Sequence, residues 1–146
     1  DCKDPIYISM IGSLLEDPRQ NTRVLIQCLS RLGAISEFPK ISKFLVREAI
    51  SPGTKGAAIA AASNLFGETK LFPELEKHLF LVNQNDRQCA VNDLIDYGDI
   101  NLLPLVLKTP VAPSFRIRAL EKLWPQNCNE VNGLELFEIL DLLKLH

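Results

Sequence analysis

Leu32-Gly33-Ala-Ile-Ser-Glu-Phe-Pro39 is the first of three stretches that share one spacing, followed by Phe66-Gly67 to Pro73 and Tyr97-Gly98 to Pro104. Each has a large apolar or aromatic residue, then a glycine, then a proline six positions later. The copies are separated by 34 and 31 residues. An apolar residue follows each proline by two positions (Ile41, Leu75, Val106), and a lysine follows it by four (Lys43, Lys77, Lys108).

This spacing predicts a helix, a corner and a second helix in each copy. Glycine adopts the left-handed conformation that ends many helices without a Cβ penalty. Proline has the backbone angle of a first helical turn, and the amide hydrogen that it lacks would have no partner there. Before Gly33 and after Pro39 the apolar residues recur with helical periodicity. A repeat of this length with helical patterning predicts an all-α fold, an α-solenoid of stacked helix pairs.

The repeat predicts that the whole chain forms a single array of helix pairs. Residues 1–16 resemble the second half of a repeat, because Pro5 precedes Pro39 by 34 positions. Complete repeats are expected at 17–50, 51–81 and 82–109, followed by a partial repeat at 110–125. An opening at Asp1, with half a repeat, favours a fragment of a longer chain.

Local signals suggest where individual helices begin and end. Asp17-Pro18 predicts the start of the first complete repeat's leading helix, and Ser114 is a good N-cap for the last one. Residues 126–133 read as a polar loop. The wide apolar face of residues 132–146 predicts a C-terminal helix, which either caps the stack or docks on another chain.

Composition excludes several classes of function. Apolar residues make up 47% and charged residues 23%, as in an ordinary globular protein, and no apolar run reaches the length of a membrane-spanning helix. A net charge of −2 and a pI near 5.7 argue against nucleic acid as a partner. Only two histidines are present, so we expect no metal site. No phosphate-binding glycine-rich loop and no hydrolase motif occurs.

The four cysteines are widely separated and form no CxxC motif. Cys28 and Cys89 lie on apolar helix faces and are expected to be buried small hydrophobic residues. This usage favours a reduced, cytoplasmic compartment over a disulfide framework.

Three features of the first two repeats allow a functional or a structural interpretation. Arg19 and Arg23 share a helix face, where they bind an anion, pair with Glu16 or Glu48, or are solvated. The small side chains of residues 57–62 permit close helix packing or form the floor of a groove. His78 has no ligand partners at metal-binding spacing and is expected at or near the surface.

The third and fourth repeats are richer in charged and aromatic side chains. Asp93 and Asp96 are three residues apart on one helix, and Asp99 is a candidate N-cap for the next. Arg116 and Arg118 are two apart and point in different directions, so only one can face a given groove. Capping, solvation and inter-repeat packing are the structural interpretations of all these residues.

One stretch of these repeats resembles a known family. It runs through Asp86-Arg87-x-x-Ala90 and Tyr97-Gly98-Asp99 to Pro113-Ser-Phe-Arg116-Ile-Arg118-Ala119-Leu120-Glu-Lys-Leu123-Trp124-Pro125. It is similar to the HEAT-repeat bilin lyases of the E/F type, which attach linear tetrapyrroles to cysteines of phycobiliproteins, detach them or act as bilin chaperones. The resemblance covers roughly residues 17–125, mostly at scaffold positions, and carries over no catalytic residue.

The resemblance implies a linear tetrapyrrole as substrate, with no tightly bound cofactor. It also implies a phycobiliprotein subunit and a second HEAT-repeat chain as partners. Arg87 with Arg116 or Arg118 would hold the propionates, Asp93 or Asp96 would bond pyrrole N–H groups, and Tyr97 and Trp124 would stack on the ligand. A lyase or chaperone subunit is therefore one hypothesis. The alternatives are a HEAT-repeat adaptor that binds a partner protein on its concave face, and, least favoured by charge, a nucleic-acid-binding solenoid.

Overall fold

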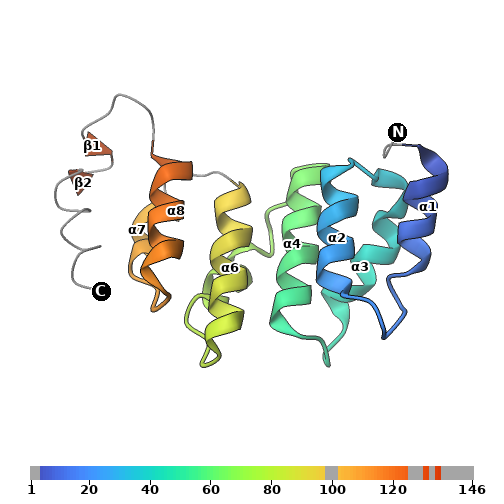
Figure 1. Ribbon diagram of the computed structural model, residues 1–146, viewed down its shortest axis with the longest axis horizontal. Helices are drawn as coiled ribbons and strands as arrows, with labels where there is room; N and C mark the ends of the chain where they lie inside the picture. Colours follow the sequence, from blue (N-terminus) through green and yellow to red (C-terminus); the bar gives the residue numbers. More distant parts are fainter. Residues whose placement is uncertain (1–3, 98–101, 125–129, 132–133, 136–146) are drawn as a thin grey trace. The chain divides into compact units, whose positions relative to one another are not determined.

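The computed structural model describes residues 4–97, 102–124, 130–131 and 134–135. Within these ranges most of the chain is helical, and the predicted all-α class is confirmed (Figure 1). The chain divides into two compact units, Asp1–Leu75 and Glu76–His146, with the boundary inside one short helix. That the two units form a single array stays a prediction.

The helices are distributed over both units. The helices of the first unit are α1 (Pro5–Ser13), α2 (Thr22–Arg31), the short 3-10 helix η1 (Ile35–Glu37), α3 (Phe38–Val46) and α4 (Pro52–Phe66). Helix α5 (Phe72–His78) spans the boundary between the units. The second unit contains α6 (Gln84–Tyr97), α7 (Leu103–Leu107) and α8 (Pro113–Leu123), followed by the two-residue strands β1 (Glu130–Val131) and β2 (Leu134–Glu135).

The corner glycines and prolines behave as their spacing predicts. Gly33 and Gly67 have φ values of 69° and 68°, in the left-handed region, where they end α2 and α4. The prolines at 39, 73 and 104 all lie at the second position of a helix, in α3, α5 and α7. Gly98 and Asp99 lie outside the described residues.

Two predicted helix starts are wrong. Residues 17–20 form a turn, closed by the Gln20 amide on the Asp17 carbonyl, and α2 begins only after Asn21, whose side chain caps the Val24 amide. The side chain of Asn21 caps the N-terminus of α2, and this cap determines where the helix starts more strongly than the earlier Asp-Pro pair does. In α8 the first residue is Pro113, so Ser114 lies inside the first turn, and no side chain caps this helix.

The C-terminal prediction also needs correction where the structure describes it. Leu134–Glu135, inside the expected helix 132–146, instead pairs antiparallel with Glu130–Val131. The two residues between the strands are Asn132-Gly133, and Asn-Gly between short strands is a strong hairpin signal. The remainder of the expected helix lies outside the described residues.

The core of the first unit lies between α2, α3 and α4. Helix α4 packs against both α2 and α3, and Figure 1 shows α2 and α4 side by side with α3 behind them. Leucine, isoleucine and phenylalanine side chains from α2 and α3 meet three alanines of α4; the buried set includes Ile26, Leu29, Ile41, Phe44, Ala57, Ala58 and Ala61. Close packing is therefore what the small side chains of α4 provide. Cys28, and Cys89 in the second unit, are partly buried, less deeply than predicted for buried small hydrophobic residues.

In the second unit, α8 packs against both α6 and α7. The apolar positions of these helices are buried, among them Ala90, Leu94, Val106 and Ala119. Helix α8 therefore contacts both of the helices that precede it in this unit. The three repeated lysines, Lys43, Lys77 and Lys108, are all exposed, which confirms that they occupy the face opposite the core.

Candidate functional site

Arg87 on α6 is a structural clamp. Its Nε atom donates to the Pro110 carbonyl at 2.8 Å, and its Nη1 atom donates to the carbonyls of Leu81 and Val82 at 2.7 and 2.8 Å. The first carbonyl belongs to the connection between α7 and α8, and the other two to the connection between α5 and α6. One guanidinium thus holds two loops against α6, and most of its donors point at backbone.

Arg116 on α8 is held by the same α7–α8 connection. Its Nε and Nη2 atoms both donate to the Thr109 carbonyl, at 3.2 and 3.1 Å. Arg116 is only 5% exposed, and Thr109 is fully buried. The structure therefore brings Arg87 and Arg116 to adjacent peptide groups, Pro110 and Thr109. A guanidinium this deeply buried serves the scaffold rather than an external ligand.

Arg118, unlike Arg116, lies at the protein surface. It is exposed, and its Nη1 atom lies 3.4 Å from the Oδ1 atom of Asn92 on α6. Arg116 and Arg118 therefore point in different directions, as their spacing predicts. Two exposed residues lie next to this contact in the sequence of the helices: Asp96 is one turn after Asn92 on α6, and Ile117, 44% exposed, precedes Arg118 on α8. We call these four residues the α6–α8 face.

The other predicted site residues are divided between interior and surface. Asp93 is 2% exposed and is engaged by neighbouring groups, whereas Asp96 is exposed, so the two aspartates do not share one site. Trp124 is half-buried at the end of α8, where its amide donates to the Leu120 carbonyl at 2.9 Å. The backbone of Tyr97 ends α6, and its side chain lies outside the described part of the chain.

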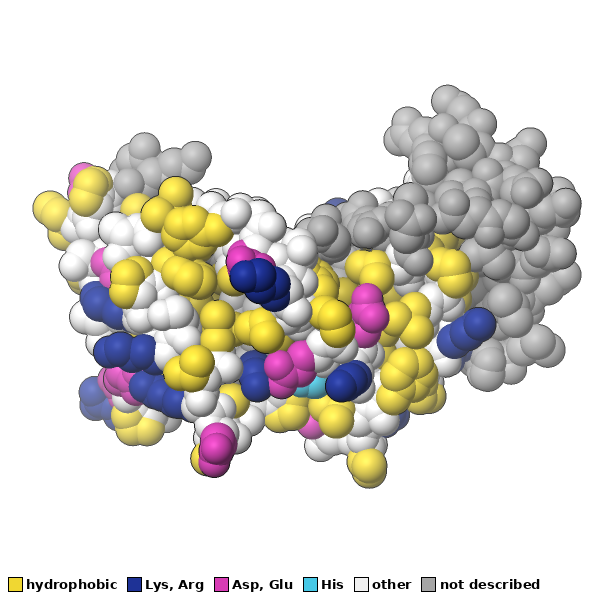
Figure 2. All heavy atoms as spheres, turned by 180° about the vertical axis from the view of Figure 1, so that it is seen from behind, with side chains coloured by type: hydrophobic (Ala, Val, Ile, Leu, Met, Phe, Trp, Pro, Cys, Tyr) yellow, Lys and Arg dark blue, Asp and Glu magenta, His cyan; other side chains and the backbone are white. Residues whose placement is uncertain are grey.

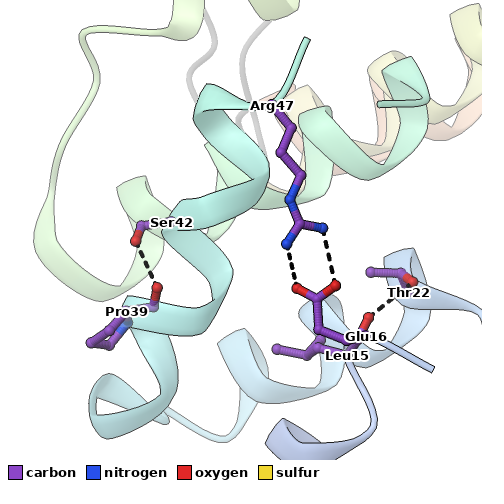
Figure 3. Close-up of polar contacts among 6 residues, drawn as sticks. All are labelled: Leu15, Glu16, Thr22, Pro39, Ser42 and Arg47. Atoms are coloured by element: carbon purple, nitrogen blue, oxygen red, sulfur yellow. Dashed lines mark hydrogen bonds and ion pairs between the residues drawn. The ribbon is translucent and has the colours of Figure 1, made fainter. Parts of the chain in front are cut away.

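Arg19 and Arg23 of the first unit bond groups of the protein itself, and neither pairs with Glu16 or Glu48 in the contacts of the structure. Arg19 is bound to Asp17 through two hydrogen bonds, and Arg23 donates to the Gly53 carbonyl at 2.7 Å. Glu16 pairs instead with Arg47, whose guanidinium donates to both carboxylate oxygens (Figure 3). Both arginines are therefore committed to the protein's own groups.

The sequence carries a signal that our reading of it missed. The leading helices α2, α4, α6 and α8 each have a basic residue near their start, at Arg23, Lys55, Arg87 and Arg116, with intervals of 32, 32 and 29 residues. Three of them bond a carbonyl of a helix start or of a helix connection, and Lys55 pairs with Glu74 on α5. Repetition at the repeat period marks such residues as scaffold, which the spacing alone could have revealed.

Surface charge and possible metal ligands give little indication of other chemistry. On the face shown in Figure 2, Lys and Arg side chains are interspersed with Asp and Glu among hydrophobic side chains. Among the residues that the structure describes, no group of three or more His, Cys, Asp or Glu side chains could hold a metal ion. His78 is buried, with 9% exposure. In the same ranges, no helix is long and apolar enough to cross a membrane.

Comparison with known proteins decides the family. The chain is 35% identical over 142 residues, 97% of its length, to the bilin biosynthesis protein CpeY of Synechococcus sp. (strain WH8020). The chain belongs to the family of this bilin biosynthesis protein. The resemblance noted from the third and fourth repeats is thereby confirmed.

Another relative supports the same family assignment. Over 121 residues the chain is 28% identical to an uncharacterized phycocyanin operon protein Y of Pseudanabaena tenuis (strain PCC 7409). The chain spans about a third of the length of these relatives, 33% and 28% respectively. No protein-family model matches the chain, and no solved structure matches it.

Proposed function

We propose that this chain binds a linear tetrapyrrole and takes part in its attachment to a phycobiliprotein cysteine, as a lyase or bilin-chaperone subunit. One observation carries the proposal: 35% identity to a bilin biosynthesis protein extends over 97% of the chain. The similarity therefore leaves at most a few residues of the chain unmatched. A phycobiliprotein subunit and a second HEAT-repeat chain are the proposed partners, and the cytoplasm is the proposed location.

Of the predicted site residues, Asp96 and Arg118 belong to the α6–α8 face, and both are exposed to a ligand. Arg118 is exposed and its contact with Asn92 is long, at 3.4 Å, so its guanidinium is available to a propionate. Asp96 would accept pyrrole N–H groups, and Ile117 offers apolar contact. Trp124 and Tyr97 keep their proposed stacking role. Arg87 and Arg116 would act at a distance, by holding the helix connections that position α6 and α8.

The proposed thioether formation requires little chemistry from the side chains of this protein. Formation of a thioether by addition of a thiol across a carbon–carbon double bond releases no group, so the chain's contribution would be to hold the bilin extended and oriented. We assign no catalytic residue. Because Arg116 and Asp93 are buried and Arg87 bonds the helix connections, orientation by the α6–α8 face is the role that the described residues support.

A visible absorption titration with phycocyanobilin tests the proposal. We expect a saturable, red-shifted spectrum, because a bilin that is bound in an extended conformation changes its absorption. Arg118→Ala should weaken binding by about tenfold, the effect of losing one charge-assisted contact of about 1.4 kcal/mol. Lys122→Ala is the matched control, because Lys122 is an exposed cation on the same helix.

Two outcomes would contradict the proposal. Equal weakening by Arg118→Ala and Lys122→Ala would indicate nonspecific attraction of the propionates rather than a site. No spectral change with a chain shown by circular dichroism to be helical would favour the HEAT-repeat adaptor, which binds a partner protein and no pigment.

A further inference from the structure

Arg118 differs from the other two arginines of the second unit in what it bonds. Arg87 and Arg116 donate to backbone carbonyls of the helix connections. The Arg118 side chain is exposed, and its Nη1 atom donates to the Oδ1 atom of Asn92 at 3.4 Å. This contact uses one of the five N–H donors of a guanidinium. Within the described residues, the edge formed by Nε and Nη2 has no acceptor and is left for a ligand.

Asn92 can orient this guanidinium without neutralising its charge. Asn92 is half-buried on α6, which packs against α8, so its amide oxygen has a defined place beside Arg118. A carboxylate at position 92 would form an ion pair with the guanidinium, whereas an amide is uncharged. Asp96 and Glu121 are exposed carboxylates on the adjoining turns of α6 and α8, and within the described residues neither forms an ion pair with Arg118. The charge of Arg118 is therefore available to an anionic group of a ligand.

We propose that Arg118, oriented by Asn92, holds one ionised propionate of the bilin, so that the α6–α8 face selects a free carboxylic acid over its ester. This selectivity rests on the proposed function, because the carboxylate belongs to the bound tetrapyrrole. A carboxylate accepts two parallel charge-assisted hydrogen bonds from one edge of a guanidinium. Esterification removes the negative charge that makes these two bonds strong, so the ester loses most of this contact.

The surroundings of Arg118 favour one propionate rather than both. Arg87 and Arg116 are committed to backbone carbonyls, so neither offers a second guanidinium. Lys122, one turn after Arg118 on α8, is an exposed cation, but an ammonium is a strongly hydrated point charge without a planar fork. Asp96 on α6 is exposed and would repel a second carboxylate that approached this helix. The site therefore distinguishes the two propionates of a bilin from each other.

Visible absorption titrations with four ligands test this selectivity: phycocyanobilin, its two monomethyl esters and its dimethyl ester. We expect one monoester to bind as tightly as the diacid, and the other to bind as weakly as the diester, about tenfold less tightly. Nonspecific attraction of negative charge would instead weaken binding by a similar factor at each esterification. In Arg118→Ala all four ligands should bind with about the affinity of the diester.

The positioning role of Asn92 is tested by the ratio of the affinities for the diacid and the diester. Asn92→Ala should lower this ratio severalfold, and Asn92→Asp should bring it close to one, because the new carboxylate pairs with Arg118. A merely structural effect at position 92 would change the affinities for acid and ester equally and leave their ratio unchanged. Asn85→Asp is the matched control, since Asn85 is exposed on the same helix, and it should keep the ratio of the unmodified protein.

The failure of this selectivity can be distinguished from the failure of bilin binding. Two monoesters of equal affinity, or a diester that binds as tightly as the diacid, would overturn the selectivity while the binding of a bilin stands. A ratio that is unchanged in both Asn92 variants would overturn the positioning role. No spectral change with any of the four ligands would contradict the proposed function, and the selectivity with it.

Discussion

Arg116 and Arg118 show how two residues of the same type, two positions apart, acquire different tasks. Arg116 is buried and bonds the Thr109 carbonyl through two nitrogens, while Arg118 is exposed and lies 3.4 Å from the Asn92 Oδ1 atom. The 100° turn per residue of a helix directs side chains two positions apart to different faces. Only the packing of α8 against α6 and α7 determines which of the two enters the interior.

The two arginines should therefore respond differently to substitution. Arg116→Ala should destabilise the fold by about 2–3 kcal/mol, since it leaves the buried Thr109 carbonyl without its charged donor. Arg118→Ala should change the free energy of unfolding by less than about 0.5 kcal/mol, as is usual for exposed positions. Urea denaturation of both variants measures the difference. Comparable losses would mean that Arg118 also supports the scaffold.

Substitutions at Gly67 test whether the left-handed backbone conformation at the end of α4 requires glycine. A Cβ at this position would meet no atom within 4 Å, so the cost of a side chain is conformational only. Gly67→Ala should destabilise the protein by about 1–2 kcal/mol, because alanine is strained at a φ of 68°. Gly67→Asn should cost less, since asparagine tolerates this region. Thermal unfolding that ranks the two variants equally would contradict this explanation.

The Glu16–Arg47 pair should make the stability of the protein depend on pH. The Arg47 guanidinium, through its hydrogen bonds, lowers the pKa of the Glu16 carboxyl below its ordinary value of 4.5. A lowered folded-state pKa contributes stability that is present above 4.5 and is lost as the pH falls through the folded-state pKa. A carboxyl-detected NMR titration should show a lowered pKa for Glu16 that returns toward 4.5 in Arg47→Met. An unchanged pKa in that variant would assign the shift to other groups.

At the scale of elements, α1 joins the first unit through an unusually close contact. A Cβ at Gly12 would lie within 3 Å of the buried Glu37 carboxylate, which also pairs with Lys40 at 2.8 Å. Glycine at this position lets α1 approach η1 more closely than any other residue would allow. The packing of α1 therefore depends on one absent methyl group.

A double-mutant cycle tests that contact. Gly12→Ala should destabilise the protein by about 1 kcal/mol, because Glu37 must move from its buried place. In a Glu37→Ala background the same substitution should be neutral or stabilising, since alanine favours a helix over glycine. Ser9→Ala, at an exposed position of the same helix, controls for general effects on α1. Additive effects at positions 12 and 37 would exclude the proposed contact.

At the scale of the whole molecule, the division into two units and the predicted single array can be compared by experiment. Residues in contact across an array share stability with their neighbours, whereas independent units unfold separately. The single array predicts that Leu29→Ala, in the core of the first unit, lowers hydrogen-exchange protection in α6 and α8 as well as in α2. Protection lost only within residues 4–75 would show that the units unfold independently.

Much of this architecture could be predicted from local signals. Gly33 and Pro39 act through their own backbone angles, so their spacing identified the corners and the helix pairs without knowledge of any neighbour. The pairing of Glu130–Val131 with Leu134–Glu135 could have been predicted in the same way, because the intervening sequence Asn132-Gly133 is a local turn signal. The start of α2 was missed because Asp17-Pro18 and Asn21 offer competing caps, and the structure uses the second.

The sequence by itself determined the helical class, the repeat and the family, because these follow from local conformational preference and from side-chain identity along the chain. Only the tertiary structure decided the roles of the charged residues. Arg87, Arg116 and Asp93 became part of the scaffold, while Arg118 and Asp96 remained at the surface. The burial and the hydrogen-bond partners of a side chain depend on contacts between helices that are distant in sequence. No local sequence pattern predicts those contacts.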